Sequence, residues 1–203
     1  MIRRATPDDA NALSALASRA FSETFGHLYR EDDLSAFLRE AYAPDVLRAE
    51  LADPDRATWL LFPGSAPSGP DGPCGPDGAD CPDDADCPDD ADCPEGAGQS
   101  PVGYASARPA ALPHAAVRPG DGEVQRLYVL SGHQGNGRGS ALLATALRWL
   151  EREGPRPVWL GVWSGNPGAQ RLYERHGFSR VGEYAFMVGS HADHELIYRR
   201  PPL

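Results

Sequence analysis

The feature that most constrains the fold is an apolar strand, a glycine-rich turn and an apolar-striped helix that follow one another without a break. The strand is "EVQRLYVL" (123–130), the turn is "GNGRGS" (135–140), and the helix runs to about Glu153 with leucines along one side. Glycine is costly inside regular structure, so a turn with this many glycines needs a structural reason. A strand that passes through such a turn into a helix predicts an α/β chain.

The glycine turn has two interpretations, a flexible connection or a backbone cradle for an anion. Unpaired N–H groups and the helix dipole at a helix N-terminus favour phosphate. The strand before the turn and the helix after it favour the cradle. The motif is not the dinucleotide-binding pattern G-x-G-x-x-G with an acidic residue after the next strand. It is not a P-loop either, because a P-loop needs a lysine and the chain contains none. The sequence therefore predicts phosphate binding outside the common nucleotide folds.

Hydrophobic periodicity and helix-end signals predict further elements on both sides of this unit. Helices are expected from Thr6 and Pro7 onward, over 31–42, from Pro44 to just before Pro54, and from Asn166 to a C-capping Gly177. Strands are expected over 57–62, 102–110, 157–163, 179–188 and 194–200. The strand at 157–163 is apolar on both faces, which is typical of a buried central strand.

Residues 63–101 interrupt this pattern with Pro, Gly, Asp and Cys in six-residue units such as CPDDAD. The segment has no arginine, and from Gly64 to Pro101 it has no aromatic residue, Leu, Ile or Val. Such a stretch cannot bury enough apolar surface to offset its ordering entropy. We expect an expanded low-complexity loop that joins two hairpin strands, 57–62 and 102–110.

All the cysteines of the chain lie in this insertion, at positions 74, 81, 87 and 93. Their spacing differs from the C-x₂₋₄-C of zinc sites, and the aspartates lack the pattern of a calcium loop. Disulfides are not expected in a reducing cytoplasm. We therefore expect no metal, with metal binding by this segment as the alternative to a plain loop.

The net charge of −10 comes from the insertion, which holds ten of the 29 acidic residues. The rest of the chain has 19 acidic and 19 basic residues, and no basic patch predicts nucleic-acid binding. The N-terminal residues lack an uninterrupted apolar run, so neither a signal peptide nor a membrane segment is expected. We predict a cytoplasmic protein without nucleic-acid or membrane partners.

Strand "VQRLYVL" is followed by "QGNGRG" (134–139), and a later segment reads "NPGAQRLYERHGF" (166–178). These stretches match Q/R-x-x-G-x-G/A and N-x-x-A-x-x-x-Y followed by GF, and together they resemble the Gcn5-related N-acetyltransferase (GNAT) family. The resemblance covers nearly the whole chain apart from 63–101. It implies one domain over 1–203, with a mixed, mostly antiparallel central sheet splayed between its fourth and fifth strands and flanked by helices. Within the family, the chain looks closest to bacterial polyamine acetyltransferases of the PaiA type.

The resemblance implies acetyl-CoA as co-substrate, with its pyrophosphate wrapped by the glycine turn. Arg138 either adds charge to a phosphate or is a solvated loop residue, and Asn166 either faces the cofactor as well as capping its helix or caps alone. Backbone groups of two strand residues would bond the pantetheine arm. The cofactor-binding residues implied are Leu127, Val129, Gln134, Gly135, Asn136, Gly137, Arg138, Gly139, Ser140 and Asn166.

For catalysis, the resemblance implies an oxyanion-stabilising N–H on Val129 and a general acid at Tyr173, whose alternative is a packing role. Family members often carry Glu four residues before the position of Val129, and here that residue is Gln125, whose amide cannot take a proton at neutral pH. Glu123 on the same strand could act through water, or solvent could deprotonate the amine while Gln125 orients it. His27 is a weaker candidate.

The resulting hypothesis is an N-acetyltransferase that modifies a primary amine of a small molecule, with a polyamine as the subgroup resemblance implies. The alternative is a CoA-binding regulatory or interaction module weakened by Gln125. The identity of the acceptor and the presence of a homodimer are left open, because one scaffold of this kind serves many acceptors.

Overall fold

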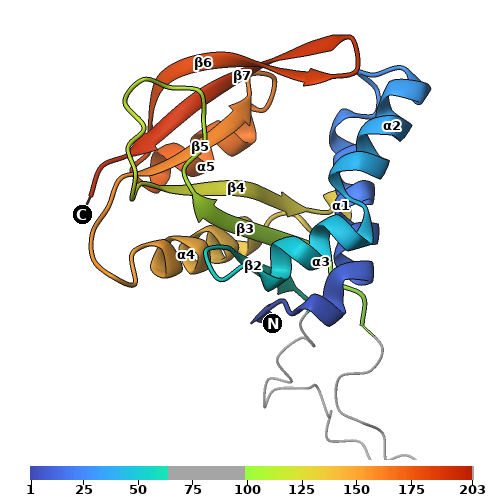
Figure 1. Ribbon diagram of the computed structural model, residues 1–203, viewed down its shortest axis with the longest axis horizontal. Coiled ribbons are helices and arrows are strands. Elements are labelled where there is room, and N and C mark those ends of the chain that lie inside the picture. Colours follow the sequence, from blue (N-terminus) through green and yellow to red (C-terminus); the bar gives the residue numbers. More distant parts are fainter. Residues whose placement is uncertain (64–98, 203) are drawn as a thin grey trace, which may run out of the picture.

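The computed structural model describes residues 1–63 and 99–202, and its centre is a seven-stranded sheet (Figure 1). The strands lie in the order β1-β2-β3-β4-β5-β7-β6. They are β1 (Ile2–Arg4), β2 (Ala57–Leu61), β3 (Gly103–Pro109), β4 (Gly122–Val129), β5 (Val158–Trp163), β6 (Ser179–Val188) and β7 (His191–Arg200). The helices are α1 (Ala10–Phe25), α2 (Glu31–Ala41), α3 (Pro44–Ala52), α4 (Arg138–Leu150) and α5 (Pro167–Arg175).

Among the described strands, only β4 and β5 pair in parallel, and every other neighbouring pair is antiparallel. The parallel pairing is short, because it joins only Gly122 with Val158 and Glu123 with Trp159. Beyond these residues the two strands diverge, as the ribbon shows (Figure 1). The predicted α/β fold, with a mostly antiparallel sheet splayed between the fourth and fifth strands, is confirmed.

A β-bulge shapes the part of β4 that leaves β5. Ser106 of β3 pairs with Arg126 and Ala107 pairs with Val124, so Gln125 is an extra residue on β4. A bulge bends its strand and increases its twist. The bend therefore lies where β4 and β5 separate.

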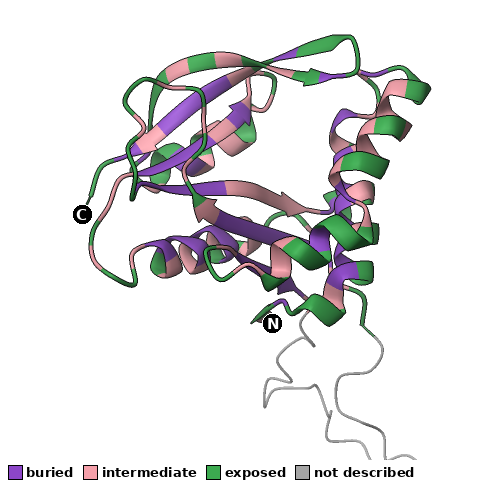
Figure 2. Cartoon of the chain, in the orientation of Figure 1, coloured by how far each residue is buried: buried purple, intermediate pink, exposed green. Residues whose placement is uncertain are grey.

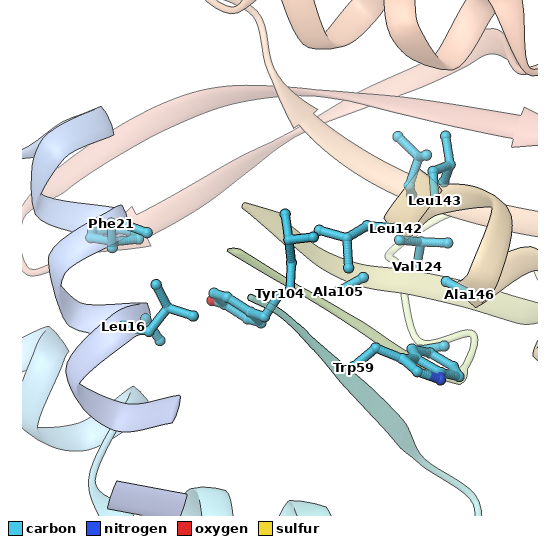
Figure 3. Packing of buried hydrophobic residues seen from close by; sticks show 14 of the residues in the cluster. Leu16, Phe21, Trp59, Tyr104, Ala105, Val124, Leu142, Leu143 and Ala146 are labelled. Atoms are coloured by element: carbon cyan, nitrogen blue, oxygen red, sulfur yellow. The ribbon is translucent and has the colours of Figure 1, made fainter. Parts of the chain in front are cut away.

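Helices cover both faces of the sheet, and alternate residues of β3 show why. Tyr104 points toward α1, where Leu16 lies, whereas Ala105 points toward Leu142 of α4 (Figure 3). Successive side chains of a strand point to opposite faces, so β3 contributes to a core on each side. Strands β2 and β3 are buried along most of their length, whereas the outer half of β4 is only partly buried, and the outer helices expose one side (Figure 2).

The predicted helices and strands are confirmed to within a few residues, and the hairpin of β2 and β3 is confirmed by its register, which ends on Leu61 opposite Gly103. Sequence reasoning missed β1, a strand of three residues. Its pattern of one apolar residue and two arginines carries no strand signal, and its pairing with β2 defines it. Most of the 63–101 insertion, with its four cysteines, lies outside the described residues.

Candidate active site

The glycine turn is held in a left-handed conformation at the N-terminus of α4. Gly135, Asn136 and Gly137 have φ values of 86°, 49° and 73°, and Gly137 caps the helix. A Cβ built on either glycine meets no heavy atom of the described chain within 4 Å. A left-handed residue followed by the right-handed residues of a helix, as at Gly137, turns successive backbone N–H groups toward a common point, which makes a concave anion site. The turn therefore has the backbone geometry and the open space that a phosphate needs.

The outer half of β4 presents its peptide groups to the space left by β5. The Leu130 N–H donates to Val102 at 2.9 Å, so Leu130 faces β3. Because peptide groups alternate along a strand, those of Leu127 and Val129 face the opposite side, where β4 has no partner strand. The carbonyl of Val129 accepts from Gln134 Nε2 at 3.0 Å. The N–H of Val129 points the same way and has no hydrogen-bond partner among the described residues.

A cavity of about 450 Å³ lies at the splay. Residues of β4, β5, β6, β7 and α5 line it together with residues of α1 and of the segment after α1. The sequence-predicted residues that it brings together are Glu123, Gln125, Leu127, Val129, Gln134, Asn166 and Tyr173. Its remaining walls are mainly aromatic, with Phe21, Phe37, Tyr42, Trp163, Tyr184 and Phe186 among them.

Tyr173 lies on α5 and is only 6% exposed, with its ring packed edge-on against Phe178. Burial, and next the charge of Glu195, raise the pKa of the Tyr173 hydroxyl above its usual range. The hydroxyl therefore keeps its proton at neutral pH. Asn166 begins the same helix, and its Oδ1 accepts from Ala169 N–H at 3.0 Å. The residue both caps α5 and lines the cavity.

Glu123 is buried at the point where β4 and β5 part, and both its oxygens have partners. Arg108 donates to Oε1 at 2.9 and 3.1 Å, and the N–H of Ala111 donates to Oε2 at 2.7 Å. Both carboxylate oxygens of Glu123 are therefore occupied by donors of the protein itself. Gln125 lies at the bulge, and its Oε1 is 3.5 Å from a guanidinium nitrogen of Arg56.

The other predicted residues take up positions around the turn. Arg138 donates to the carbonyl of His133 at 3.0 Å, so its side chain supports the turn. Ser140 lies 2.6 Å from Nε2 of His176 and joins α4 to α5. A Cβ on Gly139 would lie 3.5 Å from Leu172, at the same junction. His27 packs edge-on against Trp163, which lines the cavity, but His27 is not itself among the lining residues.

Sequence reasoning missed two carboxylates of the cavity, Asp193 and Glu195 on β7. Burial, and next the charge of Asp193, raise the pKa of Glu195 to about 7. Asp193 itself is bonded by the hydroxyl of Tyr29. The sequence did indicate that Asp193 and Glu195 lie on the same face of their strand, because residues two apart in a strand share a face. The strand register that places this face at the splay was not available from the sequence.

A wider groove of about 930 Å³ runs along α4, the edge strand β1 and its neighbour β2, and its lining includes Arg3, Arg4 and Arg148. Asn136, Gly137 and Arg138 also line it, so the glycine turn lies between the groove and the cavity. No group of three or more potential metal ligands occurs in residues 1–63 and 99–202. In the same residues, no helix is long and apolar enough to cross a bilayer.

Curated relatives match parts or most of the chain. An uncharacterised N-acetyltransferase of Mycobacterium tuberculosis is 39% identical over 84 residues, which are 39% of this chain and 51% of the relative. The match thus spans about half the length of that relative. Another uncharacterised N-acetyltransferase, from Lactobacillus delbrueckii, is 23% identical over 92% of this chain and 88% of its own length. Mycothiol acetyltransferase of Saccharomonospora viridis is 38% identical over 112 residues, 53% of this chain and 31% of that protein.

Solved structures share the fold at low sequence identity. The PaiA N-acetyltransferase of Thermoplasma acidophilum, crystallised with coenzyme A, superposes with a TM-score of 0.64 at 17% identity, over 99% of this chain and 98% of that one. A ribosomal-protein-alanine N-acetyltransferase of Brucella melitensis gives 0.56 at 19% identity, over 99% of both chains. The model of the acetyltransferase (GNAT) family matches residues 76–178. This match spans just over half of the chain and agrees with the splayed sheet and the glycine turn, so the protein belongs to the acetyltransferase (GNAT) family.

Proposed function

We propose that the protein is an acetyl-CoA-dependent N-acetyltransferase that acetylates a primary amine of a small molecule. The observation that carries the proposal is the unpaired edge of β4, which leads from the peptide groups of Leu127 and Val129 directly to the glycine turn. A pantetheine arm needs such a row of peptide groups, and a pyrophosphate needs the turn beyond it. The names of the curated N-acetyltransferase relatives support the same activity.

The residues of the site suit acetyl transfer. The N–H of Val129 is positioned to stabilise the negative oxygen that develops on the thioester carbonyl. Tyr173 holds its proton at neutral pH and lies in the same cavity, so it is our candidate for the acid that protonates the departing sulfur. Gln134 fixes the carbonyl of Val129 and thereby the orientation of its peptide group.

The cavity favours a cationic amine as acceptor. Its walls combine aromatic rings with three carboxylates, Glu123, Asp193 and Glu195. The two arginines in the walls are both paired, Arg108 with Glu123 and Arg126 with Glu50, so the acids not paired with an arginine are Asp193 and Glu195. Aromatic faces and acids both attract ammonium groups. A polyamine fits this chemistry, and the structural similarity to a PaiA N-acetyltransferase supports the same class.

A second candidate function is a CoA-binding regulatory module with little turnover. It is favoured by the amide of Gln125 and by the Arg108 and Ala111 bonds that occupy Glu123. Binding of CoA is expected under both functions, and amine-dependent thiol release is expected only under the first.

The test combines calorimetry with a panel of amines. Purified protein is titrated with acetyl-CoA, and thiol release is then followed with polyamines, monoamines and peptides bearing a free N-terminus. We expect binding, and turnover highest for polyamines. Binding without turnover on any amine would support the regulatory module, and turnover confined to peptides would contradict the acceptor class.

The glycine turn is tested with Gly137→Glu, which should abolish acetyl-CoA binding because a side chain and a negative charge enter the anion site. Gly154→Glu is the matched control. Gly154 also has a positive φ, 124°, and open space around it, but it lies after α4 and lines neither the cavity nor the groove. A folded Gly137→Glu protein with unchanged affinity would rule out the turn as the phosphate site.

A further inference from the structure

One carboxylate of the cavity, that of Glu195, is half-buried and has no hydrogen-bond or ion-pair partner among the described residues. We propose that Glu195 is the catalytic base that removes a proton from the acceptor ammonium, an inference that rests on the N-acetyltransferase function proposed above. The residue lies on β7 opposite Trp163 of β5, next to the splay.

The position of Glu195 directs it into the cavity. A Cβ built on Gly161 would lie 3.2 Å from Glu195 Oε2 and 2.8 Å from the hydroxyl of Tyr184. The glycine in β5 therefore leaves room for both side chains at the cavity wall. Glu195 and Tyr173 line this same cavity. A base on β7 and an acid on α5 thus face the space where the amine and the thioester would meet.

Comparison of the three carboxylates in the cavity singles out Glu195. Both oxygens of Glu123 accept hydrogen bonds, from Arg108 and from Ala111. Asp193 is bonded by Tyr29 and lies 3.3 Å from a ring nitrogen of His191. Within the described parts of the chain, the carboxylate of Glu195 has no hydrogen bond and no ion pair. A base must have a free lone pair to take a proton, and Glu195 meets this condition.

The electrostatic surroundings of Glu195 suit a base that works near neutral pH. Burial and the nearby charge of Asp193 raise its pKa to about 7, whereas an ordinary glutamate would be too weak a base. The charge of Glu195 also raises the pKa of four tyrosines from different parts of the fold, which are therefore neutral near pH 7. They are Tyr29, Tyr128, Tyr173 and Tyr184. The charges of Arg108 and Glu123, which are paired with each other, also act on Tyr184.

The proton balance closes with these residues. The amine enters as R–NH₃⁺, and Glu195 takes one proton, which leaves a lone pair on nitrogen. That lone pair forms the C–N bond at the thioester carbonyl carbon, and the C–S bond breaks. Tyr173 gives its proton to the sulfur and regains one from the new amide nitrogen. Glu195 then releases its proton to solvent, so one proton leaves for each ammonium acetylated.

The test is a pH profile of kcat/KM for the best amine of the panel, measured with the wild type, Glu195→Gln and Glu195→Asp. The wild type should rise with pH and level off near pH 7, because only the ionised carboxylate accepts a proton. Glu195→Gln should lose about 10²–10⁴-fold at pH 7, and its rate should keep rising toward the pKa of the free amine. Glu195→Asp should recover part of the rate and the lower-pH limb.

The matched control is Glu183→Gln on β6, an exposed carboxylate paired with Arg180 and His194. It should leave kcat/KM and the profile unchanged. A readout that does not depend on turnover is the carboxyl titration of Glu195 by ¹³C NMR, assigned by its loss in Glu195→Gln. We expect a midpoint near 7 in the protein without acetyl-CoA.

The outcomes separate this inference from the function on which it rests. Wild-type turnover with an unaltered profile in Glu195→Gln, or a titration midpoint near that of a free glutamate, would overturn the role of Glu195 and leave the N-acetyltransferase function intact. Acetyl-CoA binding without turnover on any amine would overturn both.

Discussion

Tyr173 is the residue whose chemistry and packing are easiest to separate. Its ring packs against Phe178, and its hydroxyl is held protonated by burial and by the charge of Glu195. Tyr173→Phe keeps the ring and removes only the proton donor. We expect turnover to fall by about 10²–10⁴-fold with acetyl-CoA affinity and melting temperature nearly unchanged, measured by thiol release, calorimetry and thermal unfolding. Unchanged turnover would reduce Tyr173 to a packing residue.

Among the helices, α5 follows a residue, Asn166, that both caps the helix and lines the cavity. Asn166 caps the helix through Ala169 N–H, and Pro167 occupies the first helical position. Asn166→Ala should lower the free energy of unfolding by about 1 kcal/mol, because the cap is lost. Asn166→Asp keeps a capping oxygen and should retain stability, measured by thermal or urea unfolding.

The same pair of variants decides whether Asn166 also contacts the cofactor. Asp lacks the amide NH₂ and adds a negative charge, so Asn166→Asp should weaken acetyl-CoA binding while it preserves the helix. Calorimetry on both variants measures this. Wild-type affinity in Asn166→Asp would show that the residue acts on α5 alone.

For the whole molecule, the question is what the 63–101 insertion contributes. Its ends are held close together, since Val102 N–H donates to the carbonyl of Leu61 at 2.7 Å. Replacing residues 64–98 by a short Gly/Ser turn should therefore leave the melting temperature nearly unchanged or stabilise by about 1 kcal/mol, because loop-closure entropy varies slowly with length. Acetyl-CoA affinity should persist, since none of the residues assigned to its binding lies in 64–98.

The replacement also removes ten acidic residues and no basic ones. If these acids attract a polycationic acceptor, kcat/KM should fall at low salt, and the difference should fade as the ionic strength rises. Loss of folding, or a stoichiometric metal bound to the full-length chain and lost on replacement, would instead make the insertion structural.

Much of the architecture follows from local sequence. Pro7 and Pro44 begin helical segments, with Thr6 and Asp9 bonded at 2.8 Å at the first of them, and apolar periodicity separates helices from strands. The glycine turn was also predictable, because few residues other than glycine adopt its left-handed conformation. These signals act within a few residues of the chain, so the sequence alone determined them, along with the family that they resemble.

The tertiary structure decided the catalytic geometry, because it depends on residues far apart in the chain. Glu123 is the first residue of the predicted strand 123–130, yet Arg108 and Ala111, which lie outside that strand, occupy its oxygens. Glu195 lies in an unremarkable C-terminal strand, yet the register of β7 on β5 puts it at the splay beside Tyr173 and Asp193. A carboxylate becomes a base through its burial and its neighbours, and strand pairing across the sheet sets both. The sequence determined the fold and the cofactor motif, and the packing of β4, β5 and β7 decided which acid is free to take a proton.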